Sequence, residues 1–127
     1  QRVQTARHEY EQKRNEWQTA YEGKIQQELK ARIRNLNAFL DEVGSDGQRG
    51  EASYPVEATR RTIVEHLKDE AEQRNIWERE IEDEYLKMNS RLRRILSKDT
   101  GFIWADVLKP AYSADKFWWL YRKPGGD

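Results

Sequence analysis

Apolar residues recur at helical spacing over residues 1–43, which indicates one face of a long amphipathic α-helix. The spacing is three, four or seven residues up to Tyr21, four from Tyr21 to Ile33, and three or four again up to Val43. A run of fours departs from a strict heptad, so we expect left-handed supercoiling to relax there. The pattern predicts a single helical arm, whose apolar positions are Val3, Ala6, Tyr10, Trp17, Ala20, Tyr21, Ile25, Leu29, Ile33, Leu36, Leu40 and Val43.

A second apolar pattern covers residues 55–98 and follows heptads more closely. Its two rows lie three and four residues apart, as the a and d positions of a coiled coil do. Arg74 and Glu78 stand in the middle of this seam, four residues apart, so we expect them to pair and to fix the register. One row holds Val64, Ala71, Glu78, Tyr85 and Leu92, and the other holds Leu67, Arg74, Ile81, Met88 and Ile95.

The segment 44–54 between the two arms is rich in glycine, serine and aspartate, which is typical of a flexible turn. Gly44 is suited to end the first helix, and Pro55 is suited to the first turn of the second. Two arms of matched length joined by a short tip fold back on each other. The predicted fold is therefore all-α, a long antiparallel two-helix hairpin of coiled-coil type. Each arm, 1–43 and 55–98, would span roughly 65 Å.

Residues 99–123 differ in kind from the arms, because half of the chain's aromatic residues lie between 102 and 121. Asp99, Thr100 and Gly101 end the long helix, and Pro110 separates two expected helical turns at 102–108 and 113–121. The pattern predicts a short aromatic-rich helical segment that caps the hairpin. Residues 124–127 are expected to form a tail.

Three interpretations of the aromatic segment stay open. It could fold over the open end of the hairpin, against Val3, Ala6, Tyr10, Leu92 and Ile95. It could lie at a membrane–water interface, where Trp, Tyr and flanking Lys or Arg are enriched. It could also dock a partner, since Trp and Tyr anchor protein interfaces. The candidate interaction residues are Trp104, Phe117, Trp118, Trp119 and Tyr121.

Composition narrows the function classes. Lys plus Arg and Asp plus Glu both number 23, so no global field attracts nucleic acid or anionic lipid. Cysteine is absent, and no apolar run reaches the roughly 18 residues of a membrane-spanning helix. Neither His8 nor His66 belongs to a metal-binding motif, and residues 44–50 lack the Lys-Ser/Thr of a phosphate loop. We therefore expect no enzyme activity, no cofactor or metal, and no small-molecule ligand.

Charge is patterned locally, with acidic residues concentrated in 69–84 and basic residues in 85–98. The basic end complements the helix dipole. A second interpretation is that two copies of the hairpin associate, with the acidic block of one against the basic block of the other.

The sequence favours a non-enzymatic structural or protein-interaction module, a fragment or subunit of a larger assembly, which binds a protein partner or itself. One alternative is a soluble coiled-coil segment of a membrane-anchored protein, with the anchor in flanking segments. Another is a weak nucleic-acid binder that uses the basic stretch 91–98, although that patch is short. No motif is diagnostic of a family, and the compartment stays open, with the cytoplasm slightly favoured.

Overall fold

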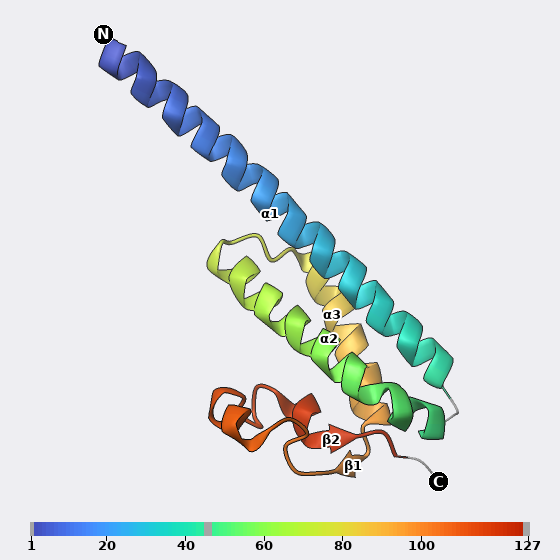
Figure 1. Ribbon diagram of the computed structural model, residues 1–127. Helices are drawn as coiled ribbons and strands as arrows, with labels where there is room; N and C mark the ends of the chain where they lie inside the picture. The colour runs from blue at the N-terminus through green and yellow to red at the C-terminus, as the bar shows by residue number, and fades with distance from the viewer. Residues whose placement is uncertain (1, 45–46, 126–127) are drawn as a thin grey trace.

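The computed structural model describes residues 2–44 and 47–125, and α-helices make up most of them (Figure 1). Helix α1 runs from Arg2 to Val43, α2 from Gly47 to Gln73 and α3 from Arg79 to Ile95. The rest of the chain contains the short strands β1 (Lys98–Asp99) and β2 (Arg122–Lys123) and the 3-10 turns η1 (Asp106–Ala111) and η2 (Trp118–Tyr121). The predicted all-α class is confirmed.

Helix α1 has 42 residues, whereas α2 has 27 and α3 has 17. At 1.5 Å per residue these lengths are roughly 63, 40 and 26 Å. Only the second half of α1 packs against α2 and α3, and its first half extends beyond them (Figure 1). All side chains from residue 5 to residue 20 are exposed. The buried face of α1 consists of Ile25, Leu29, Ile33, Leu36, Phe39, Leu40 and Val43.

The prediction that residues 55–98 form one continuous arm is wrong, because α2 ends at Gln73 and α3 begins at Arg79. Asn75 adopts the left-handed conformation, with φ of 59°. Its N–H donates to the Glu72 carbonyl at 3.1 Å, and the N–H of Ile76 donates to the Ala71 carbonyl at 2.9 Å. These two bonds form the Schellman motif that ends many helices, and asparagine tolerates the left-handed position. Ile76 then packs against the core.

Helix α3 carries favourable charges at both of its ends. Glu80 and Glu82 lie in its first turn, and Arg93 and Arg94 lie in its last. Both pairs complement the helix dipole. Its buried face consists of Ile81, Tyr85, Met88 and Leu92, so four of the five predicted heptad positions in α3 are buried, and Ile95 is partly buried.

The predicted flexible tip is largely helical. Residues 45–46 lie outside the described residues, but α2 begins at Gly47, so Pro55 lies inside the helix rather than in its first turn. Pro55 has no N–H to donate within the helix. Tertiary packing compensates for this loss. Gly50 is buried so close to α1 that a Cβ there would lie 2.6 Å from Cγ1 of Val43, and Tyr54 is buried one turn later.

The aromatic segment does not fold over the open end of a hairpin, as one interpretation expected. It lies against α2 and α3 on the side away from α1 (Figure 1). Tyr10, an expected contact of that cap, is 68% exposed. The first half of α1 extends past the ends of α2 and α3. The aromatic segment therefore cannot contact that half and the other two helices at the same time. The body thus has three layers, formed by α1, by α2 with α3, and by the aromatic segment.

The aromatic segment returns to the end of α3. Strand β1 pairs antiparallel with β2, with Lys98 opposite Lys123. The N–H of Gly125 donates to the carbonyl of Ile95 at 3.1 Å, and Pro124 is buried. Residues 124 and 125 of the expected tail are therefore packed against the body. No helix in the described part of the chain is long and apolar enough to cross a membrane.

The order of stability of two Asn75 variants tests the left-handed conformation of this turn. Asn75→Gly should match or exceed the wild type in free energy of unfolding, because glycine adopts positive φ without strain. Asn75→Ala should unfold about 1 kcal/mol more easily than Asn75→Gly, measured by urea denaturation. In a continuous helix the order would be reversed, since glycine then costs about 1 kcal/mol relative to alanine.

Candidate interaction site

The structure brings the five predicted aromatic residues into one cluster but does not expose them equally. Trp119 and Phe117 are buried, whereas Trp104, Trp118 and Tyr121 are partly buried. Trp118 and Trp119 meet edge to face with ring centres 5.5 Å apart. Consecutive side chains point in different directions, so only part of the set reaches the core. Much of the predicted docking patch is occupied by internal packing.

Trp119 is the deepest anchor of the aromatic segment. Its indole N–H donates to Oγ1 of Thr62 on α2 at 2.9 Å. The backbone carbonyl of Trp119 accepts a hydrogen bond from the hydroxyl of Tyr54, also on α2. Burial raises the pKa of Tyr54, which keeps this phenol protonated as a donor. Side chain and backbone of Trp119 are thus both bound to α2.

Arg61 lies fully buried beneath Trp119. Its guanidinium carbon is 3.8 Å from the centre of the Trp119 ring. Its nitrogens donate to Glu65 at 3.1 Å, to the Tyr85 hydroxyl at 3.0 Å and to Oδ1 of Asn89 at 3.1 Å. The hydroxyl of Tyr85 in turn donates to Glu65 at 2.6 Å. A buried charge is tolerated when it is paired and hydrogen-bonded in this way. The network joins α2, α3 and the aromatic segment.

The outer part of the cluster contacts the body more loosely. The Trp118 ring lies 4.0 Å from the guanidinium carbon of Arg93 on α3. Lys116 donates to Asp69 on α2 at 2.6 Å, and this bond raises the pKa of Lys116. The 3-10 turn η1 presents Val107, which is 84% exposed, and Leu108 to solvent.

Arg74 and Glu78 each contact α1 from the turn between α2 and α3. Arg74 pairs with Glu70 at 3.3 Å and with Glu22 of α1 at 3.9 Å. Glu78 accepts a hydrogen bond from Gln26 of α1 at 2.8 Å. Because Gln73 is the last residue of α2, the two side chains are not related by one helical turn as the sequence suggested. Both hold the turn beside residues 22–26.

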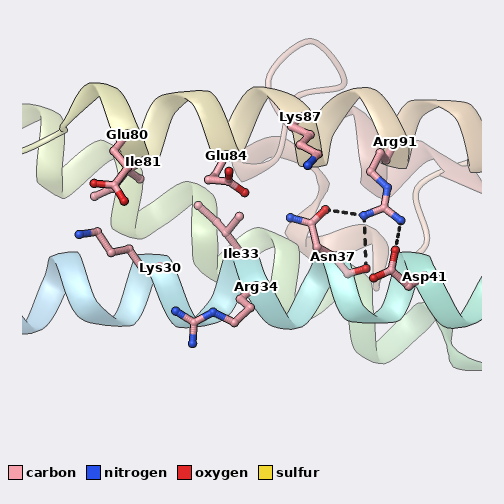
Figure 2. A pocket seen from close by; sticks show the side chains of 10 residues that line it. All are labelled: Lys30, Ile33, Arg34, Asn37, Asp41, Glu80, Ile81, Glu84, Lys87 and Arg91. Carbon is pink, nitrogen blue, oxygen red and sulfur yellow. Dashed lines mark hydrogen bonds and ion pairs between the residues drawn. The ribbon is translucent and has the colours of Figure 1, made fainter.

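A groove of about 470 Å³ lies between α1 and α3 (Figure 2). Arg91 reaches across it from α3 to donate to Oδ1 of Asn37 at 2.9 Å and to pair with Asp41 (Figure 2). Most of its lining is long charged side chains of both signs. Ligand sites are usually apolar with a few convergent polar groups, so this lining is typical of a solvated helix boundary. Its lining residues are Lys30, Ile33, Arg34, Asn37, Asp41, Glu80, Ile81, Glu84, Lys87 and Arg91.

The exposed first half of α1 carries a stripe of four apolar residues and one lysine, which no described part of the chain covers. Its positions alternate in spacing four, three, four and three, which is the a/d pattern of a coiled coil. Tyr10 is 68% exposed and Trp17 is 63% exposed. We call this set the exposed seam, and it consists of Ala6, Tyr10, Lys13, Trp17 and Ala20.

Trp17 is linked to the body of the protein through Tyr21. The two rings stack with centres 5.2 Å apart and planes 6° apart. Tyr21 donates to Glu70 of α2 at 2.8 Å, and this hydrogen bond raises the pKa of the Tyr21 phenol. The guanidinium carbon of Arg74 lies 4.6 Å from the Tyr21 ring. These contacts fix the orientation of the exposed seam where it leaves the body.

The sequence pointed to the aromatic segment and left out the exposed seam, whose apolar residues it assigned to the hairpin interior. The signal was present in the spacing, which alternates between four and three from Ala6 to Ala20 when Lys13 is counted, and is four from Tyr21 to Ile33.

Within residues 2–44 and 47–125, no cluster of His, Cys, Asp and Glu could hold a metal ion. No known protein family, curated protein sequence or solved structure gives a significant match to this chain.

Alanine substitutions at the two adjacent tryptophans should distinguish the buried Trp119 from the partly exposed Trp118 by their effects on stability. Trp119→Ala should lower the free energy of unfolding by about 3–5 kcal/mol, because it opens a cavity and removes the ring that covers Arg61. Trp118→Ala should cost about 1 kcal/mol, since its ring is partly solvated and its contact with Arg93 is a surface cation–π pair. Urea denaturation measures both. Equal losses for the two variants would contradict this assignment.

Proposed function

We propose that this chain is a non-enzymatic protein-interaction module that binds a protein partner through the exposed seam of α1. The observation that carries the proposal is the length mismatch between α1 and the helices that pack on it. All side chains from 5 to 20 are exposed, and among them are two large aromatic rings. Exposed aromatics at coiled-coil spacing are typical of a helix that packs against another helix.

Rigidity of the seam supports the same function. Helix α1 is continuous from Arg2 to Val43, so the body and the seam share one helix. Contacts of Tyr21 with Glu70 and Arg74 hold the helix where it leaves the body. A partner would therefore meet a preformed surface and would not pay the cost of ordering a disordered segment.

The basic stretch 91–98 gives less support to nucleic-acid binding. Arg91 is engaged with Asn37 and Asp41, and Arg93 is stacked on Trp118. Phosphate contacts need arginines that are free to reach one surface. These two instead face different internal partners, on α1 and on the aromatic segment.

Site-specific photo-crosslinking in cell extract tests the proposed function. A photoreactive amino acid at position 13 lies in the exposed seam, and one at position 15 lies on the opposite side of the same helix turn. We expect position 13 to give a discrete adduct with a protein, identified by mass spectrometry and reproduced with the purified partner. Position 15 should give none.

Two alanine variants provide the matched controls for that experiment. Trp17→Ala should abolish the adduct, because a buried interface tryptophan commonly contributes 2 kcal/mol or more to binding. Val107→Ala removes another exposed apolar side chain, far along the chain in η1, and should leave the adduct intact. Equal labelling from positions 13 and 15, or labelling indifferent to Trp17→Ala, would contradict the proposed function.

A further inference from the structure

We infer that the partner of the exposed seam is a second copy of this chain, aligned parallel and in register. The inference rests on the proposed function and names its partner. Like residues would then meet across the two-fold axis, so Tyr10 packs beside Tyr10 of the second copy and Trp17 beside Trp17. The seam ends at Ala20, since the next positions in the same heptad row hold Lys24 and Gln27.

The geometry of α1 leaves room for a second helix. The exposed seam and the buried face that starts at Ile25 point in different directions. At 3.6 residues per turn, the centres of these two faces lie roughly 120° apart around the helix axis. A second copy would thus approach α1 from a side that α2 and α3 do not occupy. The two bodies would lie on either side of the paired helices.

Charges beside the seam select both the partner and its direction. Glu9 and Glu16 flank the seam on one side, and Arg7 and Arg14 flank it on the other, all of them exposed. In coiled-coil notation the glutamates occupy g positions and the arginines occupy e positions. In a parallel pair, position g faces position e of the next heptad in the partner helix, so Glu9 meets Arg14 of the second copy, twice by symmetry. An antiparallel pair would instead bring Glu against Glu and Arg against Arg.

The pairing would be weak and therefore adjustable. The seam spans fewer than three heptads and includes two alanines, which bury little area, and Lys13 in the centre. A single lysine in such a seam lowers stability while limiting the allowed registers. We expect a dissociation constant of roughly 10–500 μM, as for other small interfaces. Lys13→Leu should tighten self-association about tenfold or more.

Sedimentation equilibrium on the full chain, from about 5 μM to about 1 mM, tests the inference across the expected range. The wild type should shift from monomer to dimer. Glu9→Arg and Arg14→Glu should each weaken the dimer about tenfold, and the double variant should recover the wild-type affinity within about threefold. In an antiparallel dimer neither Glu9 nor Arg14 faces an opposite charge, so the two single variants would not weaken the dimer.

The absence of cysteine from the chain allows a direct check of direction. Ala6→Cys should form a disulfide-linked dimer under mild oxidation, because the two positions meet in a parallel pair. His8→Cys, on the opposite side of the helix, should not. A monomer at all concentrations, or a dimer without charge recovery and without the Ala6→Cys disulfide, would overturn the inference. A position-13 adduct with a different protein would also overturn it while supporting the proposed function.

Discussion

The turn at residues 74–78 decides how much of the longest helix can be covered. Asn75 takes a left-handed conformation there, and two backbone hydrogen bonds end α2 after 27 residues. The chain then reverses into α3, which runs back along the same half of α1. Had the second helix continued, it would have covered α1 to its beginning, as a two-helix hairpin does. Because it stops, the protein becomes a short three-helix body from which half of α1 projects.

A body this small needs further burial, and the aromatic segment supplies it. Trp119 closes the face of α2 and α3 that α1 does not reach, and Arg61 fills the space beneath it with every guanidinium nitrogen hydrogen-bonded. A buried charge without its partners would strongly destabilise the fold. The network therefore favours this one arrangement of α2, α3 and the aromatic segment. Clustered aromatic residues thus stabilise one face of the body, whereas the two exposed rings on α1 are not part of this packing. Internal packing thus uses the aromatic segment, and the proposed binding would use Tyr10 and Trp17 of α1.

The sequence was sufficient for the helical class and for the long first helix, because apolar spacing over 1–43 is unbroken. It was misleading over 55–98, since the heptad rows continue through the turn and hide it. The relevant signal was Asn75 followed by the apolar Ile76, a pair that suits the end of a helix but is a weaker signal than the heptad pattern around it. Pro55 likewise suggested a helix start, but the close packing of Gly50 and Tyr54 overrides its local preference. The Arg61 network depends on contacts between segments far apart in the chain, so no local pattern could reveal it.

Amide hydrogen exchange along α1 tests the central claim most directly, since one helix should show two behaviours. Amides from about residue 25 to residue 43 are buried against α2 and α3 and should exchange slowly at every protein concentration. Amides from 5 to 20 should exchange fast in dilute solution, because no neighbouring helix covers them, and should become protected when the seam meets its partner. Protection of residues 5–20 equal to that of 25–43 in dilute solution would contradict the account. It would mean that the chain covers this half of α1 by itself.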